Sequence, residues 1–404
     1  MTFKQQMRRN LARTLWLAFF QVFLLIMPIA VPFFQSKGLS MQQVFSLQAL
    51  FALVVLLSEV PSGYVADVLG RKPTLIIGAL FSGVGNTVLL FADGFWGLAL
   101  FEVSLAISHS LVSGADIAMA YDSELVLDRS EQKQREVVGK LYSARTLSEA
   151  LAAFSLSALL IFVSVDLVVR IQAIIGWIPL LLAFALTEPP IRRLEASSHG
   201  QAMVEIWRYL WRHSAVLRLC FAALSIWSLT TFNAVWLLQK LWQMQSIPLA
   251  HFGYLWGGLA LVTAVAGRYA HRVEDFLGAR ALLLLIACAP VLGYLLLDRL
   301  GVVGGVLVSI TFFASRGFGL VILRDGLNRR IPSEFRATAN SLASFGFRGA
   351  FALTGPLVGY SFDLWGMHAT LLLLALASGL IALTIILPLA LAVRTEQRAA
   401  ACGV

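Results

Sequence analysis

The sequence predicts an all-α integral membrane protein in which twelve transmembrane helices form two pseudo-symmetric six-helix bundles. The first observation behind this prediction is composition, because 59% of the residues are hydrophobic, 13% are charged and the mean hydropathy is +0.81. So few charged residues cannot cover the surface of a water-soluble protein. The second is that the apolar runs are about 20 residues long, enough for a helix to cross a bilayer. The third is a likeness between the two halves of the chain.

Glycine, proline and charged residues divide the chain into twelve apolar segments, each expected to be one transmembrane helix. Their approximate bounds are 14–35, 42–66, 73–92, 95–121, 138–163, 168–187, 216–240, 251–271, 280–297, 302–323, 337–361 and 369–393. Most of the 31 lysines and arginines fall in the connectors of one side, together with both ends of the chain. The positive-inside rule therefore places both termini in the cytoplasm, and the net charge of +9 reflects this orientation rather than nucleic-acid binding.

The longest connector separates six spans from six. The predicted divisions are an N-terminal bundle over 1–187, a cytoplasmic linker over 188–215 and a C-terminal bundle over 216–404. Within the linker, the stretch "AMVEIWRYLWRH" is amphipathic. It either lies along the membrane surface as an interfacial helix or begins the seventh span, and the sequence leaves both readings open.

Charged motifs recur at corresponding places in the two halves. The matched pairs are Asp67-Val-Leu-Gly70-Arg71 with Asp275-Phe-Leu-Gly278-Ala-Arg280, Asp122 with Asp325, and Arg145 with Arg348. Asp122 and Asp325 close the fourth and tenth spans, and the two arginines lie in the fifth and eleventh. The nearly constant spacing of these pairs indicates a duplicated six-span unit.

The connector between the second and third spans reads Gly63-Tyr-Val-Ala-Asp67-Val-Leu-Gly70-Arg71-Lys72. It resembles the signature loop of the major facilitator superfamily, and the twelve spans, the duplicated halves and the long middle connector agree with that family over essentially the whole chain. The resemblance implies a secondary transporter that works by alternating access. The segments "EVPSG" (Glu59 to Gly63) and "SGADIAMAYDSE" (Ser113 to Glu124) resemble a group of bacterial members with poorly defined substrates, which implies the bacterial inner membrane.

Each residue type in this connector has a physical reason. Gly63 permits close approach of helices, and Gly70 permits a sharp turn. By the resemblance, Asp67 offers a carboxylate to the start of the eleventh span, and Arg71 reaches Asp122. These contacts would favour one access state; alternatively, the charges only end helices and orient the chain. The candidate switch residues are Gly63, Asp67, Gly70, Arg71, Asp122, Asp275 and Asp325.

Ionisable residues inside spans are costly and usually face a cavity. At about 100° per residue, the polar residues of the fourth span share one face. They are Glu102, His109, Ser113 and Asp116. His109, Asp116 and Glu149 of the fifth span are candidate proton carriers, because such groups can exchange a proton near neutral pH. Alternatively, His109 is a packing residue, Glu149 pairs with Arg145, or Asp116 pairs with Arg145.

The second half carries arginines whose own spans hold no acidic residue. Arg316 and Arg348 are therefore expected to meet a carboxylate across the bundle or an anionic group of the substrate. In the seventh span, Asn233 and Trp236 are expected to line the cavity. A partly aromatic, partly charged pocket suits an amphiphilic organic molecule. The substrate-cavity candidates are Glu102, Ser113, Arg145, Asn233, Trp236, Arg316 and Arg348.

The sequence thus predicts a monomeric transporter that moves a small organic solute across the membrane, driven by protons, with export favoured. Uptake by proton symport or uniport is the alternative, because Ser110 stands where the resemblance to drug/proton antiporters would require an arginine, and the fifth span lacks their glycine-rich motif. A membrane sensor without transport is a further alternative, although no soluble signalling domain is present. No motif predicts an enzyme, a cofactor or a metal site.

Overall fold

All regular structure in the described part of the chain is helical, as predicted. The computed structural model describes residues 2–127, 131–190, 208–209, 214–332 and 335–401, and within these ranges it contains no β-strand. Nine helical segments of this part are long and apolar enough to cross a bilayer. Twelve were expected; the first predicted span is broken, the fifth carries many charges, and the last two form one continuous segment. The predicted fold class is confirmed.

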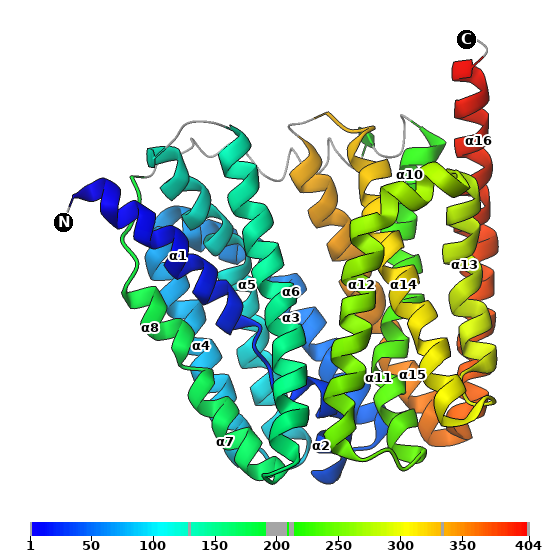
Figure 1. Cartoon of the computed structure of the whole chain (residues 1–404), viewed down its shortest axis with the longest axis horizontal. Helices are drawn as coiled ribbons and strands as arrows, with labels where there is room; N and C mark the ends of the chain where they lie inside the picture. The colour runs from blue at the N-terminus through cyan, green and yellow to red at the C-terminus, as the bar shows by residue number, and fades with distance from the viewer. Residues whose placement is uncertain (1, 128–130, 191–207, 210–213, 333–334, 402–404) are drawn as a thin grey trace. The chain divides into compact units, whose positions relative to one another are not determined.

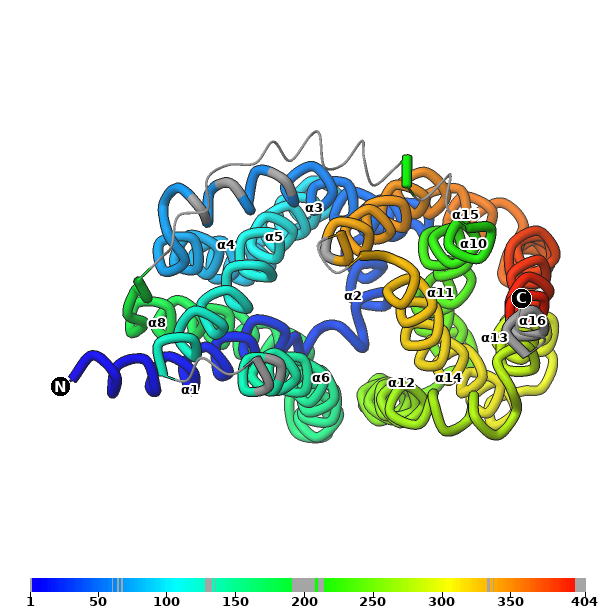
Figure 2. Tube along the Cα trace, turned by 90° about the horizontal axis from the view of Figure 1, so that it is seen from above, coloured from blue at the N-terminus to red at the C-terminus, as the bar shows by residue number. Residues whose placement is uncertain are grey.

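The chain divides into two units, of which the first comprises Met1–Glu195 together with Ile247–Gly257. Its elements are α1 (Phe3–Gln21), the short 3-10 turn η1 (Met27–Ile29), α2 (Ala30–Ser36), α3 (Met41–Leu69), α4 (Arg71–Phe91), α5 (Gly94–Leu127), α6 (Glu131–Leu160), α7 (Val165–Ile175) and α8 (Ile178–Phe184). Helix α5 packs against α1, α3, α4 and α6. The helix with the predicted polar face therefore lies at the centre of this unit (Figures 1 and 2).

Two helices of the first unit begin at capping boxes. Thr2 Oγ1 accepts a hydrogen bond from the backbone nitrogen of Gln5 at 3.4 Å, and the Gln5 side chain accepts one from the backbone of Thr2 at 3.0 Å. Ser40 and Gln43 repeat this exchange at the start of α3, at 3.3 and 3.0 Å. Each box satisfies backbone N–H groups that a helix start leaves without partners, so these ends are determined locally.

The first span is not the single helix predicted over 14–35. Helix α1 begins at Phe3 and ends at Gln21, and helical structure resumes only at Met27. Gln172 of α7 bridges the gap: its Oε1 accepts from the backbone nitrogen of Leu25 at 2.7 Å, and its Nε2 donates to Asn86 Oδ1 at 3.0 Å. Non-helical backbone at membrane depth needs partners from the protein, and Gln172 supplies them.

The second unit comprises Ala196–Ser246 and Gly258–Val404. Its elements are α10 (Ala215–Ala222), the π-helical turn η2 (Ala223–Trp227), α11 (Ser228–Met244), most of α12 (Leu249–Leu277), α13 (Ala279–Leu296), α14 (Gly301–Asn328), α15 (Arg336–Ile381), the π-helical turn η4 (Ala382–Ile386) and α16 (Leu387–Ala401). Buried apolar residues such as Leu217, Trp227, Leu282 and Leu323 form its core. The first turns of α12, within Ile247–Gly257, group with the first unit.

Two backbone irregularities shape the second unit. The seventh span passes through η2, which lies between α10 and α11, and single π-helical turns are frequent at functional sites. Helix α15 continues from the eleventh predicted span into the twelfth across Gly366, whose φ of 75° kinks the chain. Glycine adopts that conformation without steric cost. The proposed interfacial helix in the linker lies almost entirely outside the described residues.

Candidate functional site

The connector between α3 and α4 is a one-residue turn at Gly70. Helix α3 ends at Leu69 and α4 begins at Arg71, and Gly70 between them has a φ of 101° and a ψ of 166°. This conformation is essentially restricted to glycine, so the sharp turn predicted at Gly70 is present. Thr74 strengthens the start of α4, because its Oγ1 donates to the Gly70 carbonyl oxygen at 2.8 Å.

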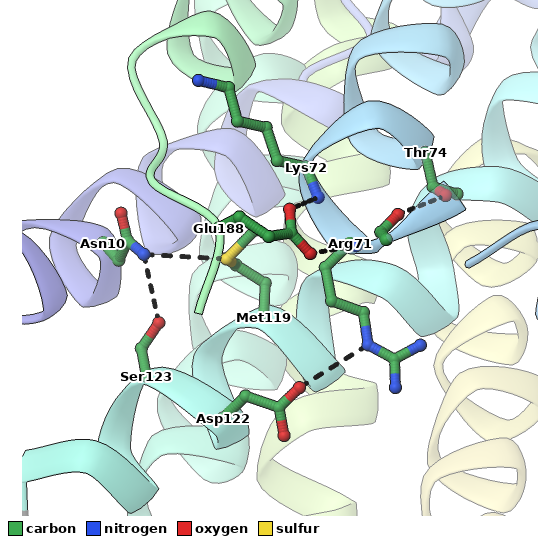
Figure 3. A network of polar contacts seen from close by, with 9 residues as sticks. Asn10, Arg71, Lys72, Thr74, Met119, Asp122, Ser123 and Glu188 are labelled. Atoms are coloured by element: carbon green, nitrogen blue, oxygen red, sulfur yellow. Dashed lines mark hydrogen bonds and ion pairs between the residues drawn. The ribbon is translucent and has the colours of Figure 1, made fainter. Parts of the chain in front are cut away.

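The start of α4 is capped by an acid from the end of the sixth span, after α8. Glu188 Oε1 accepts from the backbone nitrogen of Arg71, and its Oε2 accepts from that of Lys72, both at 2.7 Å. Figure 3 shows the carboxylate facing the first turn of the helix. A negative charge here satisfies unpaired N–H groups and meets the positive end of the helix dipole. A Cβ at Gly70 would lie 2.8 Å from Glu188 Oε1, so the glycine also leaves room for the acid.

Asn10 of α1 holds the segment that carries Glu188. Its Nδ2 donates to the carbonyl oxygen of Thr187 at 2.6 Å, and its Oδ1 accepts from the backbone nitrogen of Thr187 at 3.0 Å. The same Nδ2 donates to Ser123 Oγ of α5 at 3.2 Å. Asn10 is fully buried, and its bonds tie the first, fourth and sixth spans together beside the connector. Figure 3 shows its contact with Ser123.

Arg71 pairs with Asp122 as the sequence predicted. Its Nε lies 3.5 Å from Asp122 Oδ2, and the two side chains are 17% and 23% exposed. Both residues belong to the first unit, so this pair forms within one unit. A Cβ at Gly63 would meet no atom within 4 Å among the described residues, and the close helix approach expected there is therefore not observed. The side chain of Asp67 lies outside the described residues.

The second copy of the motif keeps the turn but not the cap. Gly278, at the start of α13, has a φ of 81°, but no side chain caps this helix and a Cβ here would meet nothing within 4 Å. Asp275 is exposed. Asp325 pairs with Arg329 one turn along α14, with Nε and Oδ2 2.7 Å apart. Only the first half therefore has an anchored connector in the described part of the chain.

Glu102 and Asp116, two of the three buried acids on α5, each have a partner from a neighbouring helix. Glu102 is 5% exposed and accepts a hydrogen bond from Gln48 Nε2 of α3 at 2.7 Å. Asp116 is fully buried and forms an ion pair with Arg145 of α6. The pairing of Asp116 with Arg145, one of the alternatives that the sequence left open, is therefore present. Among the described residues Glu102 has no ion-pair partner.

The other predicted proton carriers are less buried. His109 is half-buried on α5, and its ring centroid lies 6.0 Å from that of Phe51 on α3. Ser113 is half-buried, and Glu149 lies on an exposed face of α6. The buried residues of the polar face of α5, Glu102 and Asp116, therefore point toward α3 and α6 rather than into lipid.

The second unit contains a cavity of about 130 Å³ between η2, α11, α14 and α15. Arg316 and Arg324 of α14 line it, together with Phe232 of α11, Phe347 of α15 and the polar residues Ser228, Thr231 and Ser344. The Arg316 guanidinium carbon lies 5.7 Å from the centroid of the Phe232 ring. A charged and aromatic pocket was predicted, and Arg316 is part of this one.

Three further substrate-cavity candidates from the second half of the chain do not line this pocket. Asn233 and Trp236 are buried in α11, at 5% and 2% exposure, and do not line this cavity. In the described part of the chain, Asn233 Oδ1 and Trp236 Nε1 have no hydrogen-bond partner. Their neighbours Thr231 and Phe232 occupy the cavity wall instead, because a helix turns about 100° per residue. Arg348 is half-buried on α15, outside the lining.

Comparisons with known proteins agree with this architecture. The sequence profile of the Major Facilitator Superfamily matches residues 12–324, well over half of the chain. An uncharacterised MFS-type transporter of Burkholderia mallei (strain SAVP1) is 24% identical over 334 residues, which cover 78% of this chain and 76% of the relative. An uncharacterised MFS-type transporter of Burkholderia pseudomallei (strain 668) matches with the same values.

Solved transporters share the fold at low sequence identity. A variant of the nucleoside transporter NupG has a TM-score of 0.78 and 13% identity, covering 94% of this chain and 99% of that one. A bacterial homologue of the human lysosomal transporter Spinster, in an inward-facing and unoccupied conformation, has a TM-score of 0.74 and 14% identity, with 98% of each chain covered. A D-xylose–proton symporter has a TM-score of 0.66 and 14% identity, covering 91% and 96%.

At these identities the structural likeness shows the fold alone, whereas the profile match shows the family. The chain therefore belongs to the major facilitator superfamily, and it is a multi-pass secondary transporter of a small molecule rather than an enzyme.

Proposed function

We propose that this transporter moves a small, amphiphilic organic solute by alternating access of two bundles, 1–187 and 216–404, and couples that movement to protons in the direction of export. The family accounts for transport itself. Coupling and substrate class are argued from the polar residues inside the two units. The carrier groups we propose are the carboxyl groups of Glu102 and Asp116, with His109 and Glu149 as relays.

The observation that carries proton coupling is the burial of the Glu102 and Asp116 carboxyl groups on α5. Glu102 is 5% exposed and Asp116 is fully buried. A charge in the interior of a membrane protein is costly without a partner, and a proton removes the charge of a carboxylate. Buried acids in spans are accordingly a common feature of proton pathways.

The two carboxyl groups differ in what a proton would change. The Gln48 amide can donate to a carboxylate or accept from a carboxylic acid, so the contact between Glu102 and Gln48 suits both protonation states. Asp116 is held by Arg145, and a proton on Asp116 would weaken that ion pair and release the guanidinium. Either event alters how α5 contacts α3 or α6, which is what coupling requires.

The test is proton movement in proteoliposomes that contain the pH-sensitive dye pyranine. Solutes are first chosen by the rise in Tm that they cause in the purified protein, from a panel of nucleosides, sugars, aromatic acids and amphiphilic drugs. A selected solute should move protons with the wild type. Glu102→Gln or Asp116→Asn should abolish proton movement while keeping solute counterflow.

Asp93→Asn is the matched control, because Asp93 is an exposed acid in the connector before α5. It should behave like the wild type. Wild-type proton movement in both α5 variants would exclude Glu102 and Asp116 as the carriers. Transport of the selected solutes without any proton movement would exclude proton coupling itself.

Uptake by symport or uniport is the second candidate, and Ser110 favours it. This residue stands where drug/proton antiporters would have an arginine, and its Oγ donates to the Ala106 carbonyl of its own helix at 3.0 Å. A pH gradient imposed on the vesicles separates the cases. An antiporter accumulates the solute on the acidic side, a symporter on the alkaline side, and a uniporter responds to neither.

We also propose that the protein is a monomer in the bacterial inner membrane with both termini in the cytoplasm. The excess of lysine and arginine in alternate connectors supports the cytoplasmic position of both termini. Green fluorescent protein fused to the C-terminus should fluoresce, whereas alkaline phosphatase fused there should be inactive. Light scattering in detergent should give a protein mass close to 44.1 kDa.

A further inference from the structure

A groove of about 420 Å³ lies between α5 and α6 of the first unit. Its lining residues are Tyr121 of α5 and Gln134, Val138, Gly139 and Tyr142 of α6. The two tyrosines are 42% and 53% exposed, so both rings keep a large accessible surface. Small-molecule sites commonly have volumes of this size and aromatic lining, which makes the groove a candidate binding site.

The α6 wall of the groove continues into an ion pair. Val138, Tyr142 and Arg145 follow one another at intervals of four and three residues and therefore share one face of the helix. The Arg145 guanidinium carbon lies 5.7 Å from the centroid of the Tyr142 ring, where a cation is attracted to the ring face. The same guanidinium pairs with Asp116 of α5. One side chain thus contacts both a ring of the groove and a buried acid.

The charge of Asp116 determines how firmly this guanidinium is held. Asp116 is fully buried, and Arg145 is the charged side chain that reaches it in the described part of the chain. When the carboxyl group is ionised, Arg145 is held between Asp116 and the Tyr142 ring. When it is neutral, the ion pair is lost and Tyr142 loses a fixed neighbour. The groove therefore responds to the charge of a residue that does not line it.

Gly139 keeps the groove open. It lies inside α6, where glycine lowers helix stability relative to alanine. No close helix contact explains it, because a Cβ at this position would meet no described atom within 4 Å. Gly139 is nevertheless a lining residue, so a larger side chain here would occupy the groove. Space for a ligand is a reason for glycine at this position.

The lining suits a flat, uncharged ring system. Among the described residues that form the groove, none is charged, and two phenol rings come from neighbouring helices. Aromatic side chains pack against other rings in stacked or edge-to-face arrangements, and the phenol hydroxyl groups can meet a polar substituent. The ion pair beside Tyr142 distinguishes the groove from a surface for lipid chains, because charges at membrane depth face protein or a water-filled path.

We propose that this groove binds the flat aromatic body of the transported solute and that Arg145 links the bound solute to Asp116. Tyr121 and Tyr142 contact the ring system, whereas Arg145 is a positioning residue that acts through Tyr142. The assignment to a transported solute rests on the proposed function.

The link gives coupling a definite sign. The solute binds best when Tyr142 is held by Arg145, which requires an ionised Asp116. A proton on Asp116 and a solute in the groove therefore oppose each other, because two ligands that favour different states of one element weaken each other's binding. Opposed binding is what exchange of a solute for protons needs, and it agrees with export rather than symport.

The probe is 2-naphthol, and 2-decalol is its saturated counterpart with the same number of carbons and one hydroxyl group. Isothermal titration calorimetry of the full chain in lipid nanodiscs measures Kd, with empty nanodiscs as the blank. The wild type should bind 2-naphthol in a saturable way and 2-decalol at least several-fold more weakly. Equal binding of the two would identify a groove for hydrocarbon, such as a lipid chain, and overturn the proposal.

Three variants test the lining. Tyr121→Leu and Tyr142→Leu should each raise the Kd for 2-naphthol about twofold to tenfold, the loss expected for one aromatic contact. Gly139→Leu should abolish binding without lowering the Tm, because the leucine fills the groove and favours the helix. Gly379→Leu is the matched control. Gly379 is a glycine of α15 in the second unit, a Cβ there also meets nothing within 4 Å, and the Kd should not change.

Asp116→Asn tests the link to the ion pair. It should raise the Kd for 2-naphthol about twofold to tenfold in the wild-type background, because Arg145 no longer holds Tyr142. It should have no effect on the Kd in the Tyr142→Leu background. A general loss of structure would instead lower the number of binding sites in both backgrounds. A Kd that Asp116→Asn leaves unchanged in the wild type overturns the link.

The wild-type comparison of the two probes needs no variant, and Gly139→Leu is expected to fold, so the proposal stays testable if a tyrosine variant is unstable. Wild-type binding of 2-naphthol by Gly139→Leu and both tyrosine variants overturns the site. Tyrosine-dependent binding without proton-driven flux would retain this site and remove proton coupling. Proton-driven flux at the wild-type rate in Gly139→Leu would retain the coupling and remove the site.

Discussion

The carboxylate of Glu188 lies on the first turn of α4, with its Oε1 2.7 Å from the backbone nitrogen of Arg71. The motif connector is thus anchored by a residue from the end of the sixth span. Through Asn10, the same segment is also joined to the first and fourth spans. A connector held at both its turn and its helix start presents Arg71 to Asp122 within the first unit.

Glu188→Ala should lower the free energy of unfolding by about 1–2 kcal/mol, because it removes the acceptor for two N–H groups and the charge at a helix start. Thermal unfolding of the purified protein measures the change. Glu136→Ala is the control, since Glu136 is exposed on α6 and its loss should have little effect. Equal Tm values for the two variants would contradict the capping role.

Gly70→Ala should be more harmful than Gly278→Ala. Both glycines have positive φ, at 101° and 81°, so both substitutions carry a backbone cost of about 1–3 kcal/mol. At Gly70 the new Cβ also lies 2.8 Å from Glu188 Oε1, whereas at Gly278 it meets nothing within 4 Å. In the double variant with Gly70→Ala and Glu188→Ala, the additional loss of stability caused by the contact between the new Cβ and Glu188 should disappear. The three Tm values test this, and an unchanged excess would be the contrary result.

The ion pair between Arg71 and Asp122 should matter more for switching than for stability. At 3.5 Å and partial exposure, a double-mutant cycle with Arg71→Gln and Asp122→Asn should give a coupling energy of up to about 1 kcal/mol. Transport by either variant should nevertheless fall, since a bias of this size changes access-state populations several-fold. Solute counterflow beside a Tm measurement separates the two effects; unimpaired counterflow in both variants would remove the pair from the switch.

Arg145→Gln should be the most destabilising change at the centre of the first unit. It leaves the buried carboxyl of Asp116 without its cation, and breaking a buried ion pair costs about 3–5 kcal/mol. Asp116→Asn together with Arg145→Gln removes both charges and should recover part of that loss. Denaturation of the wild type and of these two variants in the same detergent is the measurement. A double variant no more stable than Arg145→Gln would argue against the pair.

Gln172→Leu should lower the stability of the protein, because Gln172 supplies hydrogen bonds at the break in the first span. The variant keeps the approximate size of the side chain but leaves the backbone nitrogen of Leu25, and Asn86 Oδ1, without the bonds now made at 2.7 and 3.0 Å. A buried polar group without a partner costs about 1–3 kcal/mol. A Tm equal to that of the wild type would mean that the break is satisfied in another way.

Several contacts were predictable because they depend on helical period and chain order. Arg71 begins the third span, and Asp122 lies near the end of the fourth. A short connector makes these two spans an antiparallel pair, which brings the two residues together. Asp116 and Arg145 sit at similar depths on adjacent spans. The break after Gln21 was not predictable from hydropathy, since the residues within it are as apolar as those of the helix around them.

Glu188 and Gln48 were missed for a different reason. Glu188 follows the sixth span in "TEPP", where the sequence analysis placed the start of the linker, and only an acid beside two prolines at a span end marks it. Gln48 lies in an apolar run and carries no charge. Arg324 was counted among the cytoplasmic charges and not as a cavity residue. Each acquires its role from a partner on another helix.

Hydropathy and the distribution of basic residues determined the membrane class, the approximate positions of most helices and the family connector, because these properties accumulate along a continuous stretch of chain. Which acid caps α4, which glutamine reaches Glu102 and which face of the seventh span lines the cavity were decided only by tertiary structure. A hydrogen bond requires two atoms from distant segments to meet within about 3 Å, and helix packing alone sets that distance.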